Sequence, residues 1–375
     1  MEERAVAEVL RSGWVSQGPK CSEFENAVAS FVGVRHARAV NSGTGALHLT
    51  LLACGIRPGD EVIVPAFTCV ATLNPLESIG AKPVLVDVNS RTFALEAEGV
   101  RNALTPRTKA IIVVHLFGLP ASIEPIVSLA GERGVLVIED AALSLGASIN
   151  ARAVGTFGSA AFLSFHPRKM ITTGEGGMVL TGSTDIAEVV AALRNYGASV
   201  DALQRHRGQL FELASYDRAG FNFKLTDIQA TIGLAQLKKL PEMIRRRRAI
   251  ARRYTESLAD LSWLALPEEP GGSTHVYQSY ACMLRPGLHP PIDVGRLAVV
   301  QRRFFEYLAS RGIATVQGAQ AIPTTAYYRQ KYGWPPEAYP LALLADRGSV
   351  CLPIYPDLST DEQDYVIAAV RSFDP

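Results

Sequence analysis

The stretch KAIIVVHLFGLPASIEPIVSLAGERGVLVIED, residues 109–140, carries the pattern that decides the fold. It opens with an apolar run at 109–115, continues with a helical pattern over 122–134 and closes with a second apolar run at 135–140. Near-continuous apolar runs are typical of strands buried on both faces, and a helix between two of them is typical of parallel pairing. The stretch therefore predicts one strand–helix–strand unit of a parallel sheet.

The same alternation continues on both sides of this unit. It predicts an α/β fold with a mostly parallel central sheet, and ligands bind such sheets at the carboxyl ends of the strands. A further helical stretch is expected from about 225 to 257, where Pro241 could break it. The other expected strands are 36–41, 61–65, 82–88, 160–165 and 177–182, and the other expected helices are 44–55 and 70–80.

The C-terminal part has shorter elements. The composition changes around LALPEEPGGS, residues 264–273, which predicts a large domain at 1–260 and a smaller α+β domain at 261–375. In the smaller domain we expect a strand at 276–284 and helices near 293–311 and 360–372.

Composition narrows the class of protein. The chain has 375 residues, 48% hydrophobic and 19% charged, which is a soluble globular profile. Lys and Arg total 37 against 36 for Asp and Glu, so nothing points to nucleic acid or a membrane surface. Five scattered cysteines without a CxxC pair suggest neither a disulfide framework nor a metal site. With no signal peptide and no membrane span expected, a reducing cytoplasm fits best.

A lysine in a flexible loop is the first candidate for chemistry. In SFHPRKMITTGEGG, residues 164–177, Lys169 lies between a strand end and a Gly-rich loop. A lysine that forms a Schiff base must lose its proton, and a position near the crevice of the sheet would lower its pKa. The alternative is a surface lysine before an ordinary turn. His166 could also contribute to this site, or be a packed or solvated histidine.

Two further segments point to a phosphate and to a paired acid. NSGTGALHL, residues 41–49, follows a strand and opens a helix, so amide groups and hydroxyls at Ser42, Gly43 and Thr44 could hold a phosphate. Asp140 ends an apolar strand, where a carboxylate needs a partner such as a pyridinium nitrogen. A simple helix cap is the alternative at both places, and also at Asn222 before the long helix. Together, phosphate cradle, strand-end acid and loop lysine indicate a pyridoxal-phosphate (PLP) site.

These segments resemble the DegT/DnrJ/EryC1/StrS family of PLP-dependent sugar aminotransferases, which have the aspartate aminotransferase fold. The resemblance covers nearly the whole chain. It is strongest in NSGTGALHL, DEVIVPAFTCVATLN (60–74), VIEDAA (137–142), SFHPRKMITTGEGG and GFNFKLTDIQATIGLAQL (220–237).

The resemblance implies roles for individual residues. Lys169 would bind the cofactor covalently and carry the proton, and Asp140 would pair with the pyridine nitrogen. Asn222 would reach the phosphate of the neighbouring subunit, giving a homodimer with a shared active site. Gly43, Thr44 and Ser164 would be phosphate ligands.

Two positions and one segment depart from the family pattern. Cys69 stands where many members place an aromatic ring against the cofactor, and Leu143 stands where a Gln or His commonly faces its phenolic oxygen. Both changes affect the electronics and the tightness of cofactor binding. The segment 312–323 lacks the aromatic and His residues often found near the sugar.

The expected function is transfer of an amino group from an amino acid, by resemblance glutamate, to a keto sugar linked to a nucleotide. One alternative is a cyclitol or another cyclic ketone as acceptor. A second is a PLP-dependent sugar dehydratase, a branch that typically replaces the lysine with His. A third is a PLP-binding regulatory protein without turnover.

Overall fold

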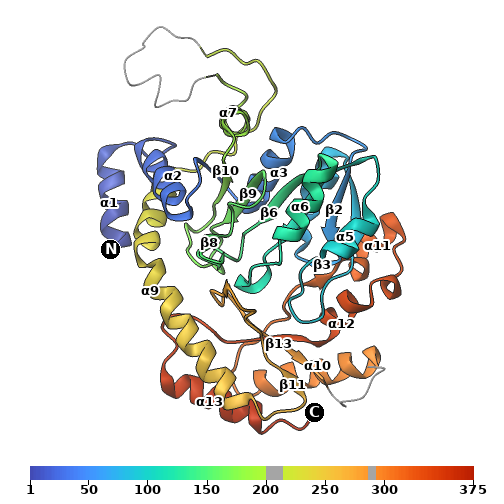
Figure 1. Cartoon of the computed structure of the whole chain (residues 1–375). Helices are drawn as coiled ribbons and strands as arrows, with labels where there is room; N and C mark the ends of the chain where they lie inside the picture. Colours follow the sequence, from blue (N-terminus) through green and yellow to red (C-terminus); the bar gives the residue numbers. More distant parts are fainter. Residues whose placement is uncertain (200–213, 286–292) are drawn as a thin grey trace.

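A seven-stranded sheet forms the centre of the molecule. The computed structural model describes residues 1–199, 214–285 and 293–375 (Figure 1). All neighbouring strands of this sheet pair in parallel, except that β10 runs antiparallel to both of its neighbours. This confirms the predicted α/β class with a mostly parallel sheet. In sheet order the strands are β4 (Lys82–Val86), β2 (Glu61–Pro65), β5 (Thr108–Val114), β6 (Leu136–Asp140), β9 (Ala160–Ser164), β10 (Gly177–Thr181) and β1 (His36–Val40).

Helices cover both faces of this sheet, as buried strands require. Residues of one parity along the strands pack under α3 (Gly43–Ala53) and α7 (Thr184–Leu193), and those of the other parity pack under a second group of helices. Ile138 belongs to the first face and Val137 to the second, so the strand end at Asp140 lies on the α3 side. The helices of the second face are α2 (Pro19–Val32), α5 (Ala97–Ala103), α6 (Glu124–Arg133) and α9 (Asp227–Leu258).

The long helix α9 runs without a break through Pro241, so the expected interruption there is wrong. Proline removes one backbone hydrogen bond, but Leu237 and Leu240 are buried beside it and hold the helix against its neighbours. A capping box of Thr226 and Gln229 fixes the start. In Figure 1 the helix passes from α1 (Glu2–Ser12) and α2 to α13 (Thr360–Arg371), so it joins the central sheet to the C-terminal part.

A second sheet, β11–β13–β15, is the centre of the C-terminal part. The expected strand at 276–284 forms only over 280–284. Its first residues turn instead along the loop after β5, where the amides of Val276 and Ser279 donate to the carbonyls of Gly118 and Phe117. The elements here are β11 (Leu264–Ala265), β13 (Tyr280–Leu284), β15 (Ser349–Leu352), α10 (Val294–Ala309), α11 (Ala326–Tyr332) and α12 (Pro340–Gly348). The division into domains at 260/261 stays a prediction.

Short elements complete the fold. The expected helix at 70–80 is divided into a 3₁₀ turn, Val70–Thr72, and α4, Asn74–Ile79. Before this turn, β3 (Phe67–Thr68) pairs with β14 (Gln320–Ala321), which brings the C-terminal part against the edge of the site. The remaining pieces are β7 (Ser148–Ile149), β8 (Arg152–Ala153), β12 (Ser273–Thr274) and 3₁₀ turns at Leu116–Gly118, Ile322–Thr324 and Pro336–Ala338.

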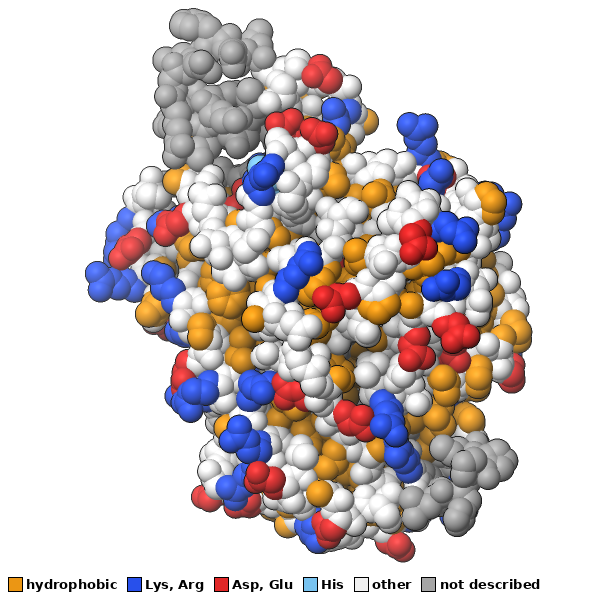
Figure 2. Space-filling model, viewed as in Figure 1, with side chains coloured by type: hydrophobic (Ala, Val, Ile, Leu, Met, Phe, Trp, Pro, Cys, Tyr) orange, Lys and Arg blue, Asp and Glu red, His pale blue; other side chains and the backbone are white. Residues whose placement is uncertain are grey.

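The surface shows no gathering of one sign of charge on the face in Figure 2, where basic and acidic side chains are intermingled. Among the described residues, none of the helices combines the length and the apolar character needed to cross a bilayer.

Candidate active site

Four strand ends bring the predicted site residues together. Asp140 ends β6 and lies opposite Phe162 of β9, two residues before Ser164. Ser164 lies opposite Gly177 of β10, and Gly177 lies opposite Val40, the last residue of β1. The register therefore places the turn after β1, with Ser42 and Gly43, beside Ser164.

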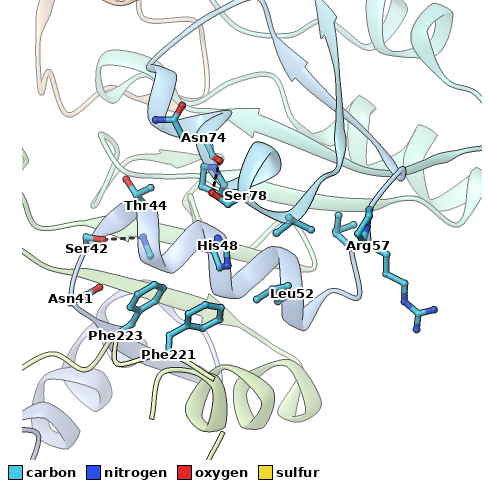
Figure 3. A pocket seen from close by; sticks show the side chains of 15 residues that line it. Asn41, Ser42, Thr44, His48, Leu52, Arg57, Asn74, Ser78, Phe221 and Phe223 are labelled. Atoms are coloured by element: carbon cyan, nitrogen blue, oxygen red, sulfur yellow. Dashed lines mark hydrogen bonds between the residues drawn. The ribbon is translucent and has the colours of Figure 1, made fainter. Parts of the chain in front are cut away.

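The start of α3 forms an anion cradle. Ser42 caps the helix, since its Oγ accepts from the Gly45 amide at 3.0 Å and its carbonyl accepts from the Ala46 amide at 2.9 Å. The amides of Gly43 and Thr44 have no acceptor within the helix and, with the positive end of its dipole, favour an anion. A Cβ on Gly43 would lie 2.7 Å from Cβ of Ser164, so only glycine lets the helix approach β9 this closely. In Figure 3 the Ser42 hydroxyl and the Thr44 side chain both lie at this end of the helix.

Lys169 is presented by a tight turn after β9. Its amide donates to the His166 carbonyl at 2.9 Å, and the Arg168 amide donates to Nδ1 of His166 at 3.3 Å. Nε2 of Gln278 donates to the Arg168 carbonyl at 2.5 Å. Burial lowers the pKa of Lys169, and the nearby charges of Asp140 and Cys69 oppose that shift. The lysine is therefore biased toward its neutral form.

Asp140 is buried and has few donors. Burial raises its pKa, against hydrogen bonds from the Ala142 amide at 3.2 Å and the Thr72 hydroxyl at 2.9 Å and the charge of Lys169. Thr72 was not among the residues predicted from the sequence. Its only signal was a position within the 60–74 motif, four residues after Thr68, whose hydroxyl lies 3.1 Å from that of Thr72. Gln278 was missed as well, because it comes from a distant part of the chain.

The other predicted residues are placed more loosely. The ring of His166 accepts a hydrogen bond within the turn through Nδ1, and its Nε2 lies 3.9 Å from Oε1 of Glu175. Cys69 is exposed and close enough to Lys169 for their charges to interact. Leu143 is half-buried against the main core. Asn222 is exposed, and its backbone forms a β-bridge with Asn195. Within the described part of the chain, this bridge does not join it to the other predicted site residues.

These residues fit a phosphorylated pyridine aldehyde. The free amides at the α3 start suit its phosphate, and Lys169 suits its aldehyde. The buried Asp140, short of donors, suits a ring N–H.

Comparison with known proteins agrees with this geometry. The family model of the DegT/DnrJ/EryC1/StrS aminotransferase family matches residues 1–371. The chain belongs to this family. The expected class of enzyme, a PLP-dependent sugar transaminase with the fold of that family, is thereby confirmed.

Solved structures of family members superpose on the whole chain. DesV of S. venezuelae is 33% identical, with a TM-score of 0.87, and the match covers 99% of this chain and 93% of DesV. The aminotransferase TlmJ of Streptoalloteichus hindustanus is 32% identical, with a TM-score of 0.88 over 99% and 95%. PseC of Helicobacter pylori, an aminotransferase involved in the biosynthesis of pseudoaminic acid, is 26% identical, with a TM-score of 0.89 over 99% and 95%.

Proposed function

We propose that this enzyme moves an amino group from glutamate to the ketone of a nucleotide-linked sugar, with PLP as its cofactor. The observation that carries the proposal is the pair Lys169 and Asp140. Burial shifts the pKa of the lysine down and that of the acid up, and the two lie within each other's electrostatic reach. Perturbed groups of opposite kind in one crevice are typical of catalytic sites. The sugar agrees with the family and with the role of PseC.

Each residue has a separate task. Lys169 would hold the cofactor until the amino donor takes its place, and its freed, neutral Nζ would then move a proton from the α-carbon of the donor to the neighbouring cofactor carbon. Asp140 holds the proton of the ring nitrogen. When bound, PLP supplies the electron sink for the carbanion. The phosphate ligands are Ser42, Gly43, Thr44 and Ser164.

The same residues run the second half of the reaction in reverse. In the second half, the neutral Nζ of Lys169 would take the proton back from the cofactor carbon and give it to the former carbonyl carbon of the sugar. The pair therefore returns to its starting state after each cycle, and two substrates share one proton carrier. A histidine at this position is typical of the sugar dehydratases, so Lys169 favours amino transfer over that alternative.

A groove beside the phosphate cradle supports the proposed homodimer. It has a volume of about 820 Å³ and lies between α3, α4 and the segment 221–223. Figure 3 shows the rings of Phe221 and Phe223 next to each other under α3, and their centroids are 4.9 Å apart. These rings flank the exposed Asn222, which in the proposed homodimer would reach the phosphate of the partner subunit from this edge of the groove. Apolar surface of this kind is typical of an interface.

Two departures make the cofactor site looser than is usual in the family. Cys69 offers a small side chain where a ring would stack, and Leu143 offers no hydrogen bond. We therefore expect weaker PLP retention and ready loss on dialysis. All five cysteines are free, in keeping with the proposed cytoplasmic location.

The first experiment asks whether the cofactor is attached to Lys169. Purified protein mixed with PLP should absorb in the visible range, and borohydride should fix the cofactor on the peptide containing residues 164–177. A colourless protein without a fixed peptide would contradict the proposal.

The second experiment separates the candidate functions. Glutamate is supplied with nucleotide-linked keto sugars and, in parallel, with cyclitol ketones, and 2-oxoglutarate is measured. Turnover with the first set supports the proposal, and turnover with the second set alone identifies a cyclitol enzyme. Cofactor binding without any 2-oxoglutarate would indicate a regulatory protein.

A further inference from the structure

A chain of two hydroxyls ends on Asp140. Oγ1 of Thr72 donates to Oδ2 of Asp140 at 2.9 Å, and Oγ1 of Thr68 lies 3.1 Å from Oγ1 of Thr72. A threonine hydroxyl has one proton, so Thr72 cannot also donate to Thr68. Thr68 must therefore be the donor to Thr72, and both bonds point toward the carboxylate.

The two threonines are shielded from water. Thr68 is fully buried and Thr72 is 2% exposed. Thr68 belongs to β3, whose backbone pairs with Gln320 of β14, and Thr72 ends the 3₁₀ turn that follows. Both hydroxyls are thus held on one buried segment whose start is paired with a distant strand, and neither can turn to water instead.

The hydroxyl of Thr72 makes the shorter of the two hydrogen bonds to Asp140. The other donor, the Ala142 amide, binds Oδ1 at 3.2 Å. A donor to a buried carboxylate favours its ionised form, and a second donor behind the first strengthens it. An ionised Asp140 is the form that can hold a proton on a ring nitrogen.

We propose that Thr72, supported by Thr68, is a positioning residue that keeps Asp140 ionised and aimed at the ring nitrogen of the cofactor. This inference rests on the proposed function. Its effect reaches the substrate only through Asp140, so Thr72 should change the rate of proton transfer rather than the binding of the sugar. The charges of Lys169 and His115 act on Asp140, and those of Cys69 and Arg168 act on Lys169; none of these groups is altered in the test.

The test compares Thr72→Val with Thr72→Ser in the full-length protein loaded with PLP. Loss of one hydrogen bond to a charged group predicts a fall in kcat of about 10- to 100-fold for Thr72→Val, with KM within about threefold of wild type. The dissociation constant of PLP, followed by its visible absorbance, should rise by about 10-fold for the same reason. The pH at which that absorbance changes should also move. Thr72→Ser keeps the hydroxyl and should stay near wild type in all three measurements.

Thr181→Val is the matched control. Thr181 is 2% exposed and lies at the far end of β10, where its hydroxyl donates to the Ser159 carbonyl at 2.8 Å and accepts from the Ser183 amide at 3.1 Å. Like Thr72→Val, this change removes a buried hydroxyl that both donates and accepts. It should lower thermal stability without changing kcat or the PLP titration. If Thr72→Val behaves like this control, the role of Thr72 is structural and the proposal is wrong.

Thr68→Val keeps the proposal testable if Thr72→Val does not fold. It should shift the same three readouts in the same direction by about two- to fivefold, since it removes only the second bond. Unchanged readouts would overturn the inference. A wild-type protein that takes up no PLP would refute the proposed function instead. Wild type that binds PLP without sugar turnover still reports on Thr72 through the absorbance.

Discussion

Glu139 and Asp140 are adjacent carboxylates on β6, and they face opposite sides of the sheet. Glu139 is fully buried and accepts from the amides of Gly155, Phe157 and Gly158, each at 2.7 Å, and from Nε2 of His115 at 3.1 Å. Nδ1 of His115 accepts from the Ala121 amide, so the ring proton is on Nε2 and donates to Glu139.

The two acids respond to burial in opposite ways. Burial raises the pKa of Glu139, but its donors outweigh this effect and hold the pKa below 4.5. Among the described residues, Asp140 accepts only from the Thr72 hydroxyl and the Ala142 amide, and burial keeps its pKa above the ordinary 3.8. A carboxylate with a complete set of donors holds structure together. A carboxylate with an incomplete set of donors can still bind a ligand. This difference identifies the face of β6 that carries Asp140 as the one that faces the active site.

The largest effect should come from the group that faces Asp140. Lys169→Ala removes both the attachment point and the proton carrier, so transamination should fall by about 10⁴-fold or more. PLP should still bind through the phosphate cradle. The measurement is 2-oxoglutarate formation beside equilibrium binding of PLP, and near-normal turnover would contradict the assignment of the lysine.

The two carboxylates themselves give the next test. Asp140→Asn removes the charge opposite the ring nitrogen, so kcat should fall by about 10²- to 10³-fold. Glu139→Gln should leave kcat within about threefold of wild type but lower the free energy of unfolding by about 1–3 kcal/mol, because buried donors lose their acceptor. Steady-state kinetics and thermal melts of both variants measure this contrast. If Glu139→Gln is the one that loses turnover, the comparison fails.

The stability of the cofactor-free protein should depend on pH in opposite directions for the two acids. Folding raises the pKa of Asp140, so its contribution is complete below 3.8 and is lost as pH rises through the folded pKa. Folding lowers the pKa of Glu139, so its contribution is present above 4.5 and is lost as pH falls through the folded pKa. At pH 8 the free energy of unfolding of cofactor-free Asp140→Asn should therefore exceed that of wild type by about 1 kcal/mol, and the variant should melt at a higher temperature.

PLP should reverse that order. Bound cofactor gives Asp140 its missing partner, so holo wild type should be more stable than holo Asp140→Asn. Differential scanning fluorimetry with and without PLP provides both comparisons. A cofactor-free Asp140→Asn that melts below wild type at pH 8 would show that the charge is already satisfied.

The smallest effect concerns the support of the lysine turn. Gln278→Ala removes the bond to the Arg168 carbonyl, so kcat should fall by about two- to tenfold. Gln236→Ala is a suitable control, since Gln236 in the first third of α9 donates to Glu2 of α1. Equal kinetics for the two variants would mean that the turn keeps its shape without Gln278.

The two faces also differ in how well the sequence predicts them. The donors to Glu139 all come from residues 115–158, one local part of the fold. The surroundings of Asp140 come from Thr72, 68 residues away, and from Lys169, whose turn Gln278 reaches across 110 residues. Local sequence patterns and motifs were enough to predict three features of the site: the strand ends, the capped start of α3 and the lysine in the loop.

Side-chain partners at such separations leave no local pattern. The sequence of the 60–74 segment looks the same whether or not one of its threonines contacts Asp140, so Thr72 could not be recognised from it. The strand expected at 276–284 failed for a related reason, because the loop after β5 supplies acceptors that a single sequence does not reveal. The expected break at Pro241 failed because packing of the long helix outweighs one lost hydrogen bond.

The antiparallel direction of β10 has a consequence for how the enzyme can go wrong. Lys169 lies in a hairpin whose two arms are β9 and β10, closed by the Phe165 amide on the Gly176 carbonyl. A slip of one residue between these arms would turn Ser164 to the opposite face and move the lysine along with it. Both strands are buried along nearly their whole length, so such a slip would also move core side chains to the wrong face. The packing of β9 and β10 therefore protects the position of the lysine.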